Sequence, residues 1–281
     1  MKFIFYIIKK ILKSNNSLYY RAEKFPIRTG YIHDLITLDY IIYHGHEKNI
    51  IQFLQNLIFK KIKKNIAIDI GAHIGTYSVF LGRFFSKIYS IEPNPISFEL
   101  LKINCKLIKN VRFFNFFLSN KNGFAYLKTS LIDSGHSFES IKKTEIKIKK
   151  KNINIFFKSI KNKIDFIKID TEGSEGNLIF QISKRLKKDK PVILFESLDS
   201  EYFKGKKSTM NVLKSIGYKY FYIPIDGSSF AKKNAFIRVY IFFQNLYLKI
   251  KYLFNKRKII QINKLKKNKN YPGIVASFKK F

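Results

Sequence analysis

Cysteine, tryptophan and glycine are scarce in this sequence, and acidic residues are few. The 281 residues include one cysteine, no tryptophan, 13 glycines and 19 aspartates plus glutamates. The single thiol, Cys105, excludes intramolecular disulfides and metal sites built from several cysteines, and it favours a reducing compartment. The hydrophobic content of 46% is nevertheless high enough for a packed core. A disordered tail protein is therefore excluded.

The charge is strongly unbalanced. Basic residues outnumber acidic ones by 54 to 19, which gives a net charge of +35. Such an excess suggests nucleic acid or an anionic membrane as a partner. Most of it is lysine, however, and it accompanies abundant Ile, Asn, Phe and Tyr, a pattern typical of a coding bias. A dedicated phosphate groove would be richer in arginine. We therefore expect no nucleic-acid partner.

Short β-branched segments alternate with helical patterns through the middle of the chain. This alternation predicts an α/β fold with a doubly wound, mostly parallel sheet. A further alternation of apolar and polar residues at 124–128 and 145–149 predicts an extra antiparallel pair. The expected strands are 66–70, 88–91, 111–118, 166–169, 192–195, 218–223 and a last one at 271–277, and the expected helices are 49–61, 76–85, 96–108, 175–186 and 207–216.

Three parts of the chain differ in character. We expect an N-terminal lid over residues 1–48, a core over 49–228 and a C-terminal extension over 229–281. Within the extension, residues 235–254 are apolar and aromatic but interrupted by basic residues. They predict either a helix at a membrane interface or a helix packed on the sheet. Because residues 1–13 lack a cleavage site, we expect a cytoplasmic protein, with contact at the inner membrane face left open.

The most informative segment is IAIDIGAHIGTYS, residues 66–78. A buried strand ends at Asp69 and passes through a glycine turn into a helix, which places Gly71 and Gly75 where ligands bind in such sheets. Dinucleotide binding requires a middle glycine, and this turn has His73 near that place. The sequence also has no G-K-[ST] phosphate loop. The turn therefore predicts a nucleoside ligand without phosphates, for which S-adenosylmethionine is the obvious candidate.

A second carboxylate supports the same ligand. Glu92 follows the next strand, at about the offset where an acidic residue binds ribose hydroxyls in nucleotide folds. Two structural interpretations stay open: Asp69 could cap a helix and Glu92 could be a solvated strand end.

Four segments together resemble the FkbM family of class I S-adenosylmethionine-dependent methyltransferases. They are IAIDIGAHIGTYSVF, SIEPNP, IDFIKIDTEGSEGNLIF and ILFES. The similarity runs from about residue 47 to residue 196, and KIDTEGSEG is its most distinctive part. The resemblance implies a Rossmann-like sheet of seven strands with a reversed last strand, and S-adenosyl-L-methionine lying over the first two strand ends.

The same resemblance implies the residues that hold this cofactor. Three residues of the turn would frame the methionine half, an acid would bind the ribose, and residues after the second and third strands would contact the ribose or adenine. His73 lies at a position that is usually Asn or His in this family. In order along the chain, the implied cofactor-binding residues are Asp69, Gly71, His73, Gly75, Glu92, Asn94 and Ser119, with Asn120 equally well placed for the last contact.

The fourth strand brings candidate catalytic residues. Alternation places Lys168 and Asp170 on one face, and the following turn brings Glu172 and Glu175 close. These carboxylates could supply a general base, a hard-cation site completed by Glu196, or capping of a helix N-terminus. Asp170 is the preferred base, with Glu172 and His136 as alternates and Lys168 beside it. A divalent metal is not expected, although Asp170 with Glu196 is the alternative to consider.

The resemblance also implies the acceptor, because related enzymes methylate hydroxyls of sugars or polyketides. We expect O-methylation of a sugar hydroxyl in a surface polysaccharide or glycolipid precursor, with that glycan or glycolipid as the partner. One alternative is an RNA methyltransferase, but the sequence at 170–173 is Asp-Thr-Glu-Gly, with neither a cysteine nucleophile nor a D-P-P-Y motif. A second is a non-catalytic glycan-binding protein on the same fold.

Overall fold

A computed structural model describes most of the core and parts of both ends. The described residues are 19–22, 25–28, 47–129, 137–140, 146–171, 173–197, 208–224, 229–230, 259–266 and 269–281.

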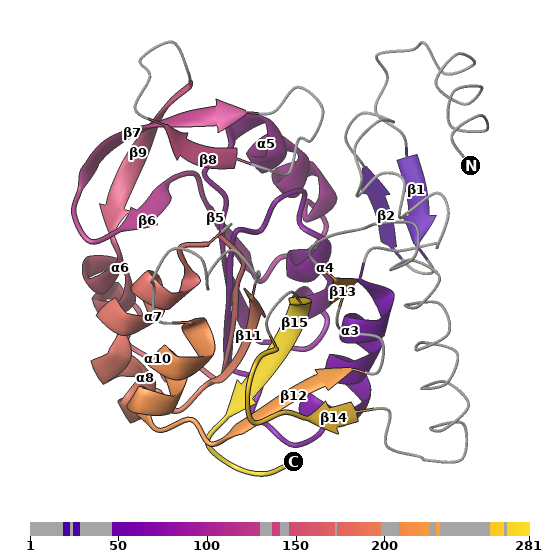
Figure 1. Ribbon diagram of the computed structural model, residues 1–281. Helices are drawn as coiled ribbons and strands as arrows, with labels where there is room; N and C mark the ends of the chain where they lie inside the picture. Colours follow the sequence, from indigo (N-terminus) through magenta and orange to yellow (C-terminus); the bar gives the residue numbers. More distant parts are fainter. Residues whose placement is uncertain are drawn as a thin grey trace.

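A nine-stranded sheet forms the centre of the molecule (Figure 1). Its order is β14-β12-β15-β11-β10-β3-β4-β5, and β13 pairs with β15 beside this path. Strands β3, β4, β5, β10 and β11 are mutually parallel where they pair, whereas β15 runs antiparallel to both β11 and β12. The strands are β3 (Ile66–Ile70), β4 (Lys87–Ile91), β5 (Val111–Phe114), β10 (Phe166–Ile169), β11 (Val192–Ser197), β12 (Tyr220–Pro224), β13 (Ser229–Phe230), β14 (Ile259–Gln261) and β15 (Lys269–Ser277).

The predicted fold class is confirmed by this topology. The mostly parallel sheet and the reversed last strand are both present, and the short strands β13 and β14 add to the seven expected. Strands β3 and β10 are buried along their whole length. Burial on both faces explains why they are nearly continuous apolar runs, and Asp69 and Lys168 are the two exceptions.

Helices cover both faces of the sheet (Figure 1). One face packs against the N-terminal helices, where Phe59 contacts Phe80, Phe85 and Phe166 with ring centroids 5.1 to 5.5 Å apart. The other face packs against the later helices. The first group is α3 (Lys48–Phe53), the π-helix η1 (Leu54–Ile58), α4 (Thr76–Gly82) and α5 (Pro95–Asn104), and the second is α6 (Ile153–Ser159), α7 (Glu175–Gln181), α8 (Ser183–Asp189) and α10 (Thr209–Ile216).

A separate four-stranded sheet lies beyond β5, with the order β6-β9-β7-β8. The expected antiparallel pair is confirmed, because β7 pairs with β9 and Tyr126 lies opposite Lys147. These strands are β6 (Phe117–Ser119), β7 (Gly123–Thr129), β8 (Ser137–Ser140) and β9 (Ile146–Asn152).

Three predicted elements are each divided into two in the structure. The single strand at 111–118 is two strands in different sheets, separated where the Asn115 side chain donates to the carbonyls of Glu92 and Pro93. The helix at 175–186 is broken at Ile182, and the helix at 49–61 continues as a π-helix from Leu54. Apolar residues recur on both sides of each of these points, so the pattern alone does not reveal the break.

Two predictions concern the N-terminal lid and the helix at 235–254. In the predicted lid, β1 (Tyr19–Ala22) and β2 (Phe25–Arg28) form an antiparallel hairpin. The predicted helix at 235–254 lies outside the described residues. Within the described parts of the chain, no helix is long and apolar enough to cross a membrane.

Candidate active site

The turn after β3 is held between the ends of two neighbouring strands. The backbone N–H groups of Gly71 and Ala72 donate to the Ile91 carbonyl at the end of β4, at 2.9 and 3.0 Å. Gly71 has φ +75°, and a Cβ there would lie 1.8 Å from the Asp170 carbonyl oxygen after β10. Only glycine fits such a close backbone approach. His73 and Gly75 also have positive φ, of 50° and 94°.

Asp69 lies beneath this turn with no exposed surface. Ser78 donates to its Oδ2 at 2.6 Å, and the Ser78 hydroxyl also lies 2.8 Å from that of Ser90. Burial raises the pKa of the Asp69 carboxyl, while Lys168 opposes that shift. The Asp69 carboxylate therefore connects β3 to α4 through Ser78. Its predicted contact with the methionine half of the donor stays a prediction.

Lys168 connects the turn to the fourth strand. Its ammonium group donates to the Gly71 carbonyl at 2.7 Å and lies 3.2 Å from Asp170 Oδ2 and 3.6 Å from Asp69 Oδ1. Burial lowers the pKa of the Lys168 ammonium, but the charges of Asp170, Asp69 and Glu47 outweigh burial and raise it overall. Lys168 is therefore a buried cation shared by two carboxylates.

Tyr77 and Glu47 complete this group, and the sequence interpretation did not include either of them. The Lys168 ammonium lies 5.3 Å from the centre of the Tyr77 ring. The Tyr77 hydroxyl donates to Glu47 Oε2 at 2.5 Å. Burial raises the pKa of the Tyr77 hydroxyl well above its usual value, and the Glu47 charge adds to the shift.

Glu92 is fixed at the end of β4 by backbone hydrogen bonds. Its Oε2 accepts from the His73 N–H at 2.7 Å, and its Oε1 accepts from the Asn94 N–H at 2.8 Å. Burial raises the pKa of the Glu92 carboxyl to about 7, even though both hydrogen bonds lower it. A carboxylate has about four acceptor positions, so each oxygen retains capacity for a hydroxyl.

Of the residues predicted near the ribose or adenine, Asn94 caps a helix, whereas Ser119 bonds to a neighbouring side chain. The buried Asn94 side chain caps α5 by accepting from the Ile96 N–H at 3.0 Å. Ser119 is the last residue of β6, and its hydroxyl donates to Asn120 Oδ1 at 3.3 Å. Asn115, which the sequence did not single out, lies directly against the Glu92 backbone.

The two carboxylates beside the loop after β10, Glu175 and Asp170, differ in burial and in hydrogen bonding. Glu175 Oε1 accepts from the Thr171 N–H at 2.6 Å, from the Thr171 hydroxyl at 3.0 Å and from the Gly173 N–H at 3.2 Å. This buried carboxylate therefore holds the loop and the start of α7. In contrast, the Asp170 side chain is 40% exposed. The predicted residues Glu172 and His136 lie outside the described residues.

The alternative metal site pairs Asp170 with Glu196. Glu196 is a partly buried residue of β11, at the bulge between Phe195 and Ser197. Across the part of the chain that the structure describes, no three His, Cys, Asp or Glu side chains form a group able to hold a metal ion.

The sheet topology and the residues at the ends of β3, β4 and β10 define a class I methyltransferase domain. Residues 69–244 match the model of the methyltransferase FkbM domain. This match covers well over half of the chain, so the protein belongs to the FkbM methyltransferase family. The resemblance expected from the sequence is thereby confirmed.

Several solved structures are similar at low identity. An FkbM methyltransferase from Methylobacillus flagellatus is 16% identical, with a TM-score of 0.40, over 56% of this chain and 39% of that one. A putative methyltransferase from Streptococcus mutans is 11% identical, with a TM-score of 0.41, over 83% and 99%. The M. jannaschii protein TYW2 is 12% identical, with a TM-score of 0.42, over 94% and 86%. No curated protein matches the chain.

Proposed function

We propose that the protein transfers a methyl group from S-adenosylmethionine to a hydroxyl of a sugar in a surface polysaccharide or glycolipid precursor. Family membership implies this donor. The observation that carries the choice of an O-methyl transfer is the exposed carboxylate of Asp170, fixed at the end of β10 by the buried Lys168.

The residues present fit the donor. Glu92 keeps acceptor capacity on both oxygens for the two ribose hydroxyls, and its position is fixed by the backbone of His73 and Asn94. The turn at Gly71 lies between the ends of β3, β4 and β10, where nucleotides bind in this type of sheet. When bound, the donor supplies a methyl group on a positively charged sulfur.

Asp170 would act on the acceptor. Methyl transfer to an alcohol is a displacement in which the hydroxyl must lose its proton as the new carbon–oxygen bond forms. Asp170 accepts that proton in the proposed mechanism, and Lys168 holds the carboxylate in place from the buried side. Glu92 binds the ribose, and Glu175 keeps the adjoining loop in position through three hydrogen bonds.

The nucleic-acid alternative has one supporting observation, the net charge of +35. The charge at the site opposes it, because the exposed carboxylate of Asp170 would repel a phosphate backbone. We propose a cytoplasmic location, with the enzyme reaching lipid-linked acceptors at the inner membrane face. Membrane contact through residues 235–254 stays a prediction, since they lie outside the described residues.

The decisive experiment measures transfer of a radioactive methyl group from labelled donor. The purified protein is incubated in parallel with a cell-envelope glycan extract and with total RNA. We expect label in the glycan fraction, and label in RNA alone would contradict the acceptor. Calorimetric titration with the donor is run beside it, because a non-catalytic glycan-binding protein need not bind the donor.

A further inference from the structure

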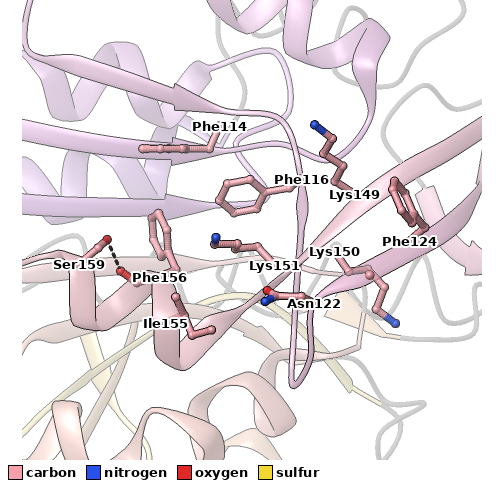
Figure 2. Close-up of a pocket in the computed structure, with 11 residues that line it drawn as sticks. Phe114, Phe116, Asn122, Phe124, Lys149, Lys150, Lys151, Ile155, Phe156 and Ser159 are labelled. Atoms are coloured by element: carbon pink, nitrogen blue, oxygen red, sulfur yellow. Dashed lines mark hydrogen bonds between the residues drawn. The ribbon is translucent and has the colours of Figure 1, made fainter.

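A cavity lies at the edge of the nine-stranded sheet that β5 forms. Its volume is about 640 Å³, in the range of pockets that bind small molecules. It lies between β5, helix α6 and the strands β7 and β9 (Figure 2). None of its lining residues is among the candidate donor or catalytic residues described above.

The wall of this cavity is aromatic. Phe114, Phe116 and Phe156 pack against one another, with ring centroids 5.3 to 5.7 Å apart. Ile155 and Phe124 extend the apolar surface, and they are 48% and 58% exposed. Mutually packed rings form a fixed surface, so an apolar ligand would meet a preformed site at little cost in side-chain entropy.

Two polar side-chain groups of the cavity already have partners within the protein. The Ser159 hydroxyl donates to the Phe156 carbonyl at 2.7 Å, and Asn122 Oδ1 accepts from the Asn152 N–H at 2.8 Å. A nucleobase or a sugar is recognised through several directed hydrogen bonds, whereas the wall between Phe114, Phe116 and Phe156 is aromatic. The body of the ligand is therefore expected to be apolar and without hydrogen-bonding groups.

Positive charge surrounds the apolar wall. Three consecutive lysines of β9, Lys149, Lys150 and Lys151, line the cavity. Figure 2 shows the Lys151 ammonium extending toward the rings of Phe116 and Phe156, whereas that of Lys150 points away from them. Alternation along β9 places Lys149 on the same face of the strand as Lys151, although Figure 2 shows the Lys149 ammonium extending away from the rings. Among the residues that the structure describes, neither has a carboxylate partner.

We propose that this cavity binds a long-chain lipid phosphate, with the hydrocarbon chain against Phe114, Phe116 and Phe156. The phosphate pairs with Lys151, whose ammonium Figure 2 shows extending toward these rings. A lysine is a compact point charge that suits a phosphate without requiring a paired geometry. The binding site stands on these contacts alone, whereas its use in holding a lipid-linked acceptor rests on the proposed function.

The absence of tryptophan allows a direct test, because one introduced indole is then the only one in the protein. Phe124→Trp places it at the cavity rim, where the residue is 58% exposed and lies 4.4 Å from Lys147 Nζ. Phe180→Trp on α7, where the residue is 66% exposed and outside the cavity, is the matched control. Each variant of the full chain is titrated with dodecyl phosphate below its micelle concentration.

We expect a saturable blue shift of the emission from Phe124→Trp and no change from Phe180→Trp. In the Phe124→Trp background, Lys151→Gln should weaken binding by about tenfold, as expected for the loss of a charge-assisted contact. Dodecanol should bind correspondingly more weakly than dodecyl phosphate.

Three results would overturn the proposal. They are the absence of a saturable shift, equal shifts at both reporter positions, and a shift with uridine monophosphate but none with dodecyl phosphate. Donor and acceptor are both left out of the titration. Failure here would therefore leave the methyl-transfer assay unaffected, and failure of that assay would leave the lipid site intact.

Discussion

The Lys168 ammonium donates a hydrogen bond of 2.7 Å to the carbonyl oxygen of Gly71. This bond ties the fourth strand to the turn after the first strand of the core, across a sequence separation of 97 residues. The same ammonium faces Asp69 and Asp170, so one side chain fixes both the turn and the carboxylates beside it.

Removing this cation should destabilise the protein. Lys168→Met leaves the fully buried Asp69 without its cation, and loss of one partner of a buried ion pair costs about 3 to 5 kcal/mol. The free energy of unfolding in urea measures the effect. Lys187→Met, on the exposed side of α8, is the control and should change stability by less than about 0.5 kcal/mol. Equal stability of both variants would contradict the buried-pair interpretation.

Gly71 and Gly173 offer a matched pair for testing the close backbone approach. Both have positive φ, but a Cβ at Gly71 would collide with the Asp170 carbonyl, whereas one at Gly173 would meet nothing within 4 Å. Gly173→Ala should cost only the backbone strain of about 1 to 2 kcal/mol. Gly71→Ala should cost at least about 3 kcal/mol, because the backbone must also move. Similar losses in denaturant titrations would argue against this packing.

Donor binding should depend on pH through Glu92. Its pKa is raised by burial to about 7, and the ionised form is the better acceptor for the ribose hydroxyls. The donor dissociation constant should therefore rise about tenfold between pH 8 and pH 6, as the ionised fraction falls. Calorimetry at constant ionic strength measures it, and a flat profile would exclude Glu92 as the ribose ligand.

The raised pKa of Glu92 affects folding stability in the opposite direction to donor binding. A carboxyl whose pKa is raised in the folded state binds its proton more tightly there than in the unfolded chain. Its contribution to stability is therefore fully present below the usual value of 4.5 and is lost as the pH rises through about 7. Low pH should thus weaken donor binding without weakening the fold through this group.

Asp170→Asn tests the proposed base. The amide keeps the shape of the side chain but accepts a proton poorly, so turnover should fall by about 10²- to 10⁴-fold. Donor affinity in calorimetry should change little. Glu99→Gln on the exposed side of α5 provides a control with the same chemical change away from the site. Full activity in Asp170→Asn would show that another group removes the proton.

Cys105 should be inert in the folded protein. It is buried beside the Gly75 turn, where a Cβ at Gly75 would lie 3.4 Å from its Sγ, and burial raises its pKa to about 12. A thiol reagent at pH 8 should label the native protein at least tenfold more slowly than the urea-unfolded protein. Because it is the only cysteine, the labelling rate reports on one site. Equal rates would show that the turn opens readily.

The parts of the fold that follow from local pattern were predictable. Strand 66–70 agrees with the structure at both ends, as does strand 166–169, because each is a short run rich in isoleucine that is followed directly by turn residues. The contact of Tyr77 with Glu47 was not predictable, since it joins the glycine-turn motif to a residue 30 positions earlier that belongs to no motif. The separation of β5 from β6 depends on Asn115, whose side-chain bonds are tertiary.

The sequence predicted which residues lie at the site better than it predicted the role of each one. The sequence placed Lys168 and Asp170 on one strand face, and the structure brings them to 3.2 Å. It left Glu175 open as a base, a cation ligand or a helix cap, and in the structure three hydrogen bonds make this residue a support for the loop. Spacing indicates which carboxylates are near one another, whereas burial and hydrogen bonding decide which one remains available to a substrate.

The position of β15 between β11 and β12 has a consequence during protein synthesis (Figure 1). The two flanking strands are translated well before residues 269–277, yet they do not pair with each other and must wait for that segment to leave the ribosome. Until then, each presents an open hydrogen-bonding edge to other chains in the cell. The nascent polypeptide is therefore expected to need a chaperone most during translation of its last quarter.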